Sequence, residues 1–222
     1  HILFTWDIAI KNVEKLIKNS QQRKRALMQQ LLTGKKRFKE FGEPVKDGDL
    51  PEKWQEIRLR DFGCCITGLT YSPDQVVNED GLLVLRSSNI QGGMLAFKDN
   101  VFVNCEVAKE NLTQESDILI CVRNGSKKLI GKTALINGRA IGVAHGAFMT
   151  LFRSKDSNYI YQLFQTPMYY KQVFQNLGAT INSINSSNLY KFRFPYPPKK
   201  ERERIASVLT KCDLEYENFM QQ

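Results

Sequence analysis

A heptad-spaced stripe of residues at the start of the chain limits the possible folds more than any other feature. Between residues 2 and 34, the positions that would face a partner helix alternate in steps of three and four residues: Leu3, Trp6, Ile10, Val13, Ile17, Ser20, Lys24, Leu27 and Leu31. This is the a/d spacing of a coiled coil, interrupted by the polar Ser20 and Lys24. Gly34 stands where the helix would end. A lone helix would leave this stripe in water, so the segment requires a helical partner.

The end of the chain supplies a candidate partner. The segment after Pro197-Pro198 is helical in composition, and its apolar positions step in the same way at Leu209, Cys212, Tyr216 and Phe219. When Leu209 is superposed on Leu3, the next three positions fall on Trp6, Ile10 and Val13, which indicates an internal repeat around one globular segment. Any two amphipathic helices can be slid into register, so chance similarity is the alternative. If the repeat is real, we expect this chain to be a piece of a longer protein, which begins a few residues inside the first copy of the repeat and ends before the second copy is complete.

The middle of the chain predicts a mainly β domain. Short apolar runs at 57–59, 62–66, 82–85, 117–122, 132–136, 147–153 and 192–196 read as strands, and 158–165 and 167–176 read as helices. Asn137-Gly138 is a hairpin signal. We therefore expect an α+β fold, with a globular domain of mainly β core and short helices flanked by long coiled-coil-forming helices. The expected order is a helix at 1–34, a linker at 35–50, the globular domain at 51–198 and the start of a second long helix at 199–222.

Composition favours a polyanionic partner without requiring one. The formal net charge is +9 and the pI is near 9.3, and the positive excess concentrates in residues 1–50. Five cysteines at unrelated spacings and two histidines give neither a zinc site nor a disulfide framework, which predicts a reducing cytoplasm. No apolar run is long enough to span a membrane.

Two segments resemble catalytic motifs without satisfying them. The run from Gly125 to Thr133 resembles a phosphate-binding loop, but five residues separate its glycines where that loop needs four. The run Phe194-Pro195-Tyr196-Pro197-Pro198 resembles the loop of amino-methyltransferases, but it lacks the Asn or Asp that accepts from the target amine. We therefore expect no catalytic residue, metal ligand or cofactor site in this chain.

Three polar and basic loops predict a nucleic-acid surface. The candidate DNA-binding residues are Arg86, Ser88, Asn89, Arg123, Asn124, Ser126, Lys127, Lys128, Asn182 and Asn185. Arg pairs with guanine, Asn with adenine, and Lys and Ser with phosphate oxygens. Arg86 and Arg123 follow buried strands and are predicted to read bases, whereas Lys127 and Lys128 sit at a loop tip and are predicted to hold phosphates. The alternative is that Asn and Ser only close turns and that the lysines form a solvated tip.

Several strings of residues then point to a known family. The strings ILICVRNGSKKLIGKTALI (118–136), GAFMTLFRS (146–154), INSINSSNLYKFRFPYPP (181–198) and RIASVL (204–209) resemble a target recognition domain from the specificity subunit (HsdS) of type I restriction-modification enzymes. TWDIAI (5–10) and KRALMQQLLTGKKRF (24–38) resemble the spacer helix of that family and its exit. The resemblance covers nearly the whole chain. It implies that this chain contains, in order, the first spacer helix, the second recognition domain and the start of the second spacer helix. The alternative is a half-length subunit that has a single recognition domain.

The resemblance also implies a function and a set of partners. A recognition domain of this family reads one half of a bipartite site in double-stranded DNA, and antiparallel spacer helices hold two domains apart. S-adenosylmethionine would belong to separate modification (methyltransferase) subunits, and ATP with Mg²⁺ to a restriction (translocase/nuclease) subunit. A second recognition domain, or a second copy of this chain, would pair with it through the antiparallel coil. The resemblance implies no contact with a membrane and a location in the prokaryotic cytoplasm. Two alternatives stay open: the recognition part of a single-chain restriction-modification enzyme, and a coiled-coil scaffold with a protein-binding head.

Overall fold

The chain folds as two compact units, which we describe separately. The computed structural model describes residues 2–46, 48–177 and 182–221, with side chains from residue 6 to residue 220 of those ranges. The helical unit comprises residues 1–56 and 195–222, and the globular unit comprises residues 57–194. The helices are α1 (Ile2–Leu31), α2 (Ser157–Leu163), α3 (Pro167–Gln175), α4 (Ser186–Leu189) and α5 (Lys199–Gln221). The strands are β1 (Gln55–Arg58), β2 (Gly63–Thr67), β3 (Val76–Val77), β4 (Leu82–Leu85), β5 (Ile90–Gln91), β6 (Met94–Leu95), β7 (Val101–Val103), β8 (Ile118–Cys121), β9 (Thr133–Leu135), β10 (Ala144–His145), β11 (Met149–Ser154) and β12 (Arg193–Tyr196).

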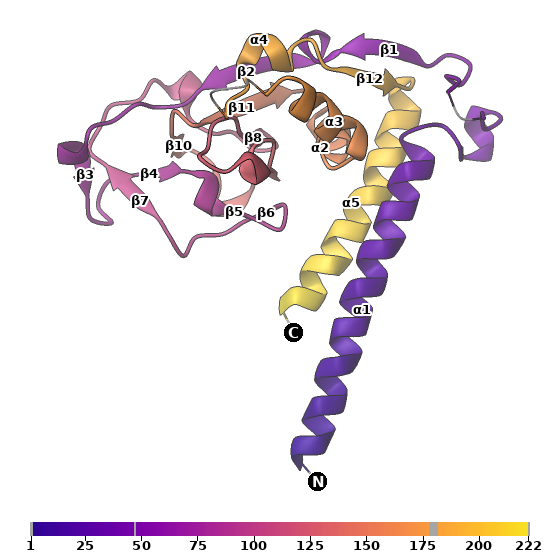
Figure 1. The fold of residues 1–222 in the computed structure, drawn as a ribbon, viewed down its shortest axis with the longest axis horizontal. Helices are drawn as coiled ribbons and strands as arrows, with labels where there is room; N and C mark the ends of the chain where they lie inside the picture. Colours follow the sequence, from indigo (N-terminus) through magenta and orange to yellow (C-terminus); the bar gives the residue numbers. More distant parts are fainter. Residues whose placement is uncertain (1, 47, 178–181, 222) are drawn as a thin grey trace. The chain divides into compact units, whose positions relative to one another are not determined.

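In the helical unit, α1 and α5 run side by side in opposite directions (Figure 1). Their ion pairs fix this antiparallel register: Lys24 contacts Asp213, Arg23 contacts Glu215, and Arg37, beyond the end of α1, contacts Glu201 near the start of α5. The side chains buried along the two helices are Ser20, Lys24, Met28 and Leu31 on α1, and Glu201, Arg202, Ile205, Ala206, Leu209 and Cys212 on α5. The C-terminal half of the predicted stripe therefore has the partner that its spacing demands.

The N-terminal part of the stripe lies beyond the reach of α5. Trp6 is 65% exposed and Ile10 is 55% exposed, while Val13 and Ile17 are half-buried. The side chain of Leu3 lies outside the described residues. On α5, Tyr216 and Phe219 are also only half-buried, and Leu27 on α1 is half-buried too. The described part of α5 does not bury Trp6 or Ile10. Their burial against the C-terminal helix or against a second copy stays a prediction.

A buried polar cluster joins the exit of α1 to the start of α5. Glu201 accepts hydrogen bonds from Arg37 Nε and Arg37 Nη2, each at 2.9 Å, and from Trp54 Nε1 at 2.9 Å. The side chains of Arg37 and Glu201 are only 3% and 1% exposed. Gly34 ends α1 at a φ of +75°, where a Cβ atom would lie 2.2 Å from Cγ of Pro51. Glycine is the residue that such a turn tolerates.

Along the chain, the boundaries between the two units fall after Glu56 and before Pro195, a few residues inside the predicted domain limits of 51 and 198. The cluster around Glu201 keeps Trp54 in the helical unit, and Arg202 Nη1 donates to the carbonyl of Pro197 at 2.7 Å. The short flanks of the predicted globular domain thus belong to the helical unit. At this junction β1 and β12 pair as a two-stranded sheet.

The globular unit is built on two four-stranded sheets. The first has the order β2-β11-β8-β9 and is antiparallel throughout. The second has the order β10-β4-β7-β3, in which β10 runs parallel to β4 and the other pairs are antiparallel. A small antiparallel pair, β5-β6, completes the strands. With short helices beside these sheets and long helices in the other unit, the predicted α+β class is confirmed.

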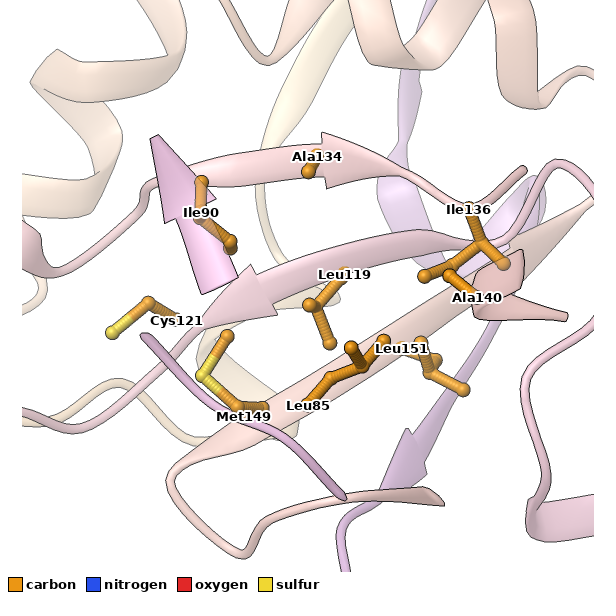
Figure 2. Close-up of a cluster of buried hydrophobic side chains, with 9 residues drawn as sticks. All are labelled: Leu85, Ile90, Leu119, Cys121, Ala134, Ile136, Ala140, Met149 and Leu151. Atoms are coloured by element: carbon orange, nitrogen blue, oxygen red, sulfur yellow. The ribbon is translucent and has the colours of Figure 1, made fainter. Parts of the chain in front are cut away.

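The main apolar core draws on both sheets (Figure 2). Its buried members are Leu85, Ile90, Leu119, Cys121, Ala134, Ile136, Ala140, Met149 and Leu151. Strand β4 alternates as a strand should, because Leu85 joins this core while Val84 joins a smaller cluster with Val103 and Ala144. All four residues of β8 are buried, so its sequence reads as a continuous apolar run.

Aromatic side chains link the first sheet to α2 and α3. Phe152 on β11 lies 6.1 Å from Phe164, which stacks on Tyr169 of α3 at 4.6 Å between ring centroids. Thr166 caps α3 by accepting from the backbone N–H of Tyr169 at 3.2 Å, and Pro167 occupies the first turn. These contacts hold β11, and with it the loop that precedes β11, in a fixed position.

The hairpin predicted at Asn137-Gly138 is wrong. Residues Gly138–Ala140 form a 3-10 turn, and the next strand, β10, joins the second sheet instead of folding back on β9. The reason is Ala140, which is fully buried and whose carbonyl accepts from Thr113 Oγ1 at 2.6 Å. Burial of Ala140 in the core outweighs the local turn preference.

Candidate nucleic-acid interface

Three polar loops that are far apart in the sequence lie against one another on the globular unit. We call them the β4 loop, the β8 loop and the α4 loop: residues 86–89, 123–128 and 182–188. Asn124 Nδ2 donates to Ser87 Oγ at 3.0 Å, which joins the first two loops. Asn182 Nδ2 donates to the carbonyl of Gly125 at 3.0 Å, which joins the second and third. The three loops predicted to bind DNA therefore form one continuous surface.

Buried strand ends explain why these loops meet. Leu85 ends β4 and Cys121 ends β8, and both side chains are fully buried in the same core. A fourth loop, residues 146–148 between β10 and β11, ties the two ends together. Gly146 N donates to the carbonyl of Leu85 at 2.9 Å, and the carbonyl of Phe148 accepts from the backbone N–H groups of Val122 and Arg123 at 3.0 and 3.1 Å. The main chain beside each arginine is thus fixed by hydrogen bonds.

A cleft of about 500 Å³ opens between the β4 loop and the loop at residues 146–148. It is lined by Leu69, Thr70, Tyr71, Arg86, Ser87, Ser88, Asp99, Gly146, Ala147, Phe148 and Met149. Gly68 makes the close approach of its wall possible, because a Cβ atom there would lie 2.1 Å from the carbonyl oxygen of Gly146. The lining combines the aromatic rings of Tyr71 and Phe148 with the guanidinium of Arg86 and the carboxylate of Asp99. It therefore suits a flat ligand that has an apolar face and polar groups at its edge.

Arg86 is held at this cleft by Asp99. Its Nη2 atom lies 2.9 Å from Asp99 Oδ2 and 3.4 Å from the carbonyl oxygen of Asp99. The Arg86 side chain is 35% exposed, while its Nε atom is buried and has no hydrogen-bond partner. The stem of the side chain is therefore enclosed and its tip is presented at the surface. Asp99 was not predicted from sequence, because only the folded chain brings it beside Arg86.

Arg123 is positioned by an aromatic ring instead of a carboxylate. Its guanidinium carbon lies 5.6 Å from the ring centroid of Phe148, a distance typical of a cation–π contact. Arg123 is exposed, and the side chain of Phe148 is 54% exposed. The sequence prediction missed Phe148, because the alternating pattern of residues 147–153 placed it inside a strand. The strand begins one residue later, at Met149.

The prediction that Asn89 contacts DNA is wrong. Asn89 is fully buried, its Oδ1 accepts from the backbone N–H of Arg86 at 2.8 Å, and its Nδ2 donates to the carbonyl of Ala96 at 2.9 Å. The side chain closes the turn that carries Arg86, as the turn-forming alternative holds. Asn185 also makes a local bond, because its Oδ1 caps α4 by accepting from the backbone N–H of Asn188 at 2.8 Å, although Asn185 itself is exposed.

The remaining candidates divide by exposure. Ser126, Lys127 and Lys128 are exposed at the tip of the β8 loop. Asn124 and Asn182 are half-buried and hold the loops together, as described above. Ser88 is half-buried, and its Oγ atom is buried with no hydrogen-bond partner. The residues best placed to reach a ligand in solution are therefore Arg86, Arg123 and the two lysines.

Comparison with known proteins shows the family of the chain. Residues 51–221 match the family model described as the type I restriction modification DNA specificity domain. The chain belongs to this family. It is 31% identical over 170 residues to the type I restriction enzyme EcoKI specificity subunit of Escherichia coli K12, covering 73% of this chain and 36% of that protein. The StySPI specificity subunit of Salmonella potsdam matches with the same identity and coverage. The chain thus spans little more than a third of the length of these curated relatives.

Solved structures share the fold. The chain resembles the HsdS subunit from Thermoanaerobacter tengcongensis with a TM-score of 0.63 at 15% identity, covering 99% of this chain and 50% of that one. It resembles the S subunit of a type I restriction-modification system from M. genitalium with a TM-score of 0.66 at 12% identity, covering 99% of this chain and 54% of that one. The resemblance inferred from sequence, to one recognition domain with its spacer helices, is confirmed.

Two further observations concern the described residues only. Among residues 2–46, 48–177 and 182–221, no group of three or more His, Cys, Asp or Glu side chains is placed to hold a metal ion. In the same ranges, no helix is both long enough and apolar enough to cross a membrane.

Proposed function

We propose that this chain reads DNA sequence as part of the specificity subunit of a type I restriction-modification complex. The globular unit would read one half of a bipartite site in double-stranded DNA. The observation that carries this proposal is the meeting of the β4, β8 and α4 loops: Arg86 lines the cleft, and Arg123 contacts Phe148, which also lines it. Membership of the DNA specificity domain family supports it.

The chemistry of the two arginines suits base reading. A guanidinium can donate two parallel hydrogen bonds to O6 and N7 of guanine in the major groove, and such a pair contributes about 1–3 kcal/mol of discrimination. Reading requires a side chain whose main chain does not move, and backbone hydrogen bonds fix the positions of Arg86 and Arg123. Lys127 and Lys128 are point charges on an exposed tip, which suits contacts with phosphates.

The helical unit would set the distance between two half-sites. Helix α1 has 30 residues, which corresponds to about 45 Å at 1.5 Å per residue. That length matches about 13 base pairs of DNA at 3.4 Å each. The exposed apolar side chains of Trp6, Ile8 and Ile10 provide a surface for a further helix, from a second recognition domain or from a second copy of this chain.

The chemistry of modification and cleavage would lie on partner subunits. We place S-adenosylmethionine on the modification (methyltransferase) subunits, which must turn the target base out of the duplex to reach it. ATP and Mg²⁺ would act on the restriction (translocase/nuclease) subunit of the same complex. The chain itself would be non-catalytic and would act in the cytoplasm of a prokaryotic cell, where its DNA substrate is found.

A salt titration tests whether the loop surface binds DNA. The chain, assembled with its methyltransferase subunits, is titrated with duplex DNA at several salt concentrations. Lys127→Ala should weaken binding to all sequences alike and flatten the slope of log K against log salt by about one unit. Lys155→Ala is the matched control, since Lys155 is also exposed but follows the opposite end of β11. Equal slopes for both variants and the wild type would contradict the proposal.

A further inference from the structure

Phe148 is a large aromatic residue that is exposed beside the polar loops and lines the cleft next to Arg86. Its side chain is 54% exposed, whereas the next residue, Met149, is 1% exposed and part of the core. The carbonyl of Phe148 accepts two backbone hydrogen bonds, from Val122 and Arg123, and Met149 N donates to the carbonyl of Gly146 at 2.8 Å. The exposure of the ring is therefore fixed by the main chain on both sides.

The ring is also coupled to the guanidinium of Arg123. The 5.6 Å separation places the cation over the aromatic face. Within the part of the chain that the structure describes, no carboxylate pairs with Arg123, whereas Asp99 pairs with Arg86. A cation–π contact does not use the N–H donors of the guanidinium in hydrogen bonds to an acceptor, so these donors remain available to a ligand. Phe148 and Arg123 thus present an apolar edge and a fork of donors side by side.

We propose that Phe148 is a specificity-determining residue that contacts the 5-methyl group of a thymine, on the base pair next to a guanine read by Arg123. This inference rests on the proposed function. Thymine is the only base that displays a methyl group in the major groove, and apolar side chains, phenylalanine among them, read it by contact. Successive base pairs are 3.4 Å apart along the helix axis. A ring and a guanidinium in contact with each other can therefore meet neighbouring pairs.

The test removes the methyl group from the DNA without changing its hydrogen bonds. Once the recognised sequence is known, each thymine of the half-site is replaced singly by deoxyuridine. Binding by the assembled complex is then measured for the wild type and for Phe148→Ala. One position should cost the wild type about four-fold in affinity, the value expected for losing one buried methyl group. At that position the Phe148→Ala complex should show no further loss.

Two variants serve as controls. Phe148→Leu keeps an apolar side chain and should retain part of the response to deoxyuridine. Phe174→Ala removes an equally exposed ring, 54%, from α3, and should leave the wild-type response unchanged. Thermal unfolding of each variant shows whether the globular unit remains folded.

Three outcomes separate this inference from others. The inference is overturned if every thymine-to-deoxyuridine change lowers the affinity of the wild type and of Phe148→Ala by the same factor. Failure of the folded Phe148→Ala chain to assemble with methyltransferase subunits would overturn it as well, because the ring would then face a protein. If the wild-type complex binds no DNA with sequence preference, the proposed function fails instead.

Discussion

Replacing Glu201 with alanine should destabilise the helical unit by about 3–5 kcal/mol. Glu201 accepts three hydrogen bonds, two from Arg37 and one from Trp54, and its side chain is 1% exposed. Removing it leaves the guanidinium of Arg37, 3% exposed, without its partner in the interior. Loss of one member of a buried ion pair costs this much because the remaining charge is desolvated and uncompensated. Arg37 keeps its charge in the variant, because a guanidinium is not deprotonated in proteins.

A neighbouring pair on the same helix provides the matched control. Glu203 lies two residues further along α5, is 62% exposed, and pairs with Lys199 across one turn at 3.8 Å. Exposed pairs of this kind contribute about 0.3–0.5 kcal/mol, because solvent screens them. Urea unfolding followed by far-ultraviolet circular dichroism measures both variants, and the slope against urea shows whether the unfolded state has changed.

A double variant separates the loss of charge compensation from the loss of packing. Replacing both Arg37 and Glu201 with methionine removes both charges at similar volume, and should recover most of the stability lost in Glu201→Ala. If Glu201→Ala and Glu203→Ala differ by less than about 1 kcal/mol, the cluster does not hold the two helices as argued.

Two further predictions concern the coil and the core. Ile10→Asp should leave the unfolding temperature of the isolated chain nearly unchanged and weaken its assembly, because Ile10 is 55% exposed. Leu209→Asp should unfold the helical unit, because Leu209 is fully buried. Calorimetry measures the unfolding temperature of each variant, and sedimentation measures its assembly. Burial lowers the pKa of His145, whose Nε2 lies 3.0 Å from the carbonyl oxygen of Ile66, so the unfolded state binds the proton more readily. Stability should therefore fall as the pH drops below about 6.5, and more steeply than in His145→Gln.

Local patterns predicted much of the fold because the signals were strong there. Strand β4 has the limits expected from its apolar run, and α3 lies within the helix predicted at 167–176. Arg86 and Arg123 were chosen as candidates because each follows a buried strand, and the ends of both strands, Leu85 and Cys121, are buried in the core; their contact with DNA stays a prediction. The length of α1 followed from its heptads.

Contacts between distant segments decided the features that the sequence could not predict. Asn89 reads as a surface residue, yet Ala96 and the backbone of Arg86 satisfy its amide in the interior. Asp99 and Phe148 become part of the site only because the loops that carry them fold beside the two arginines. These positions depend on tertiary packing, which residue spacing along the chain does not report.

Sequencing of the sites methylated by the complete complex tests the central claim most directly. With the wild-type chain, the account predicts one bipartite sequence that contains guanine at positions read by Arg86 and Arg123. Arg86→Ala and Arg123→Ala should each relax one guanine position, because a base-specific contact is lost. Lys127→Ala should preserve the full sequence at a lower level of modification, because a phosphate contact carries no sequence information. If both arginine variants methylate the wild-type sequence with unchanged stringency, the reading surface lies elsewhere on the globular unit.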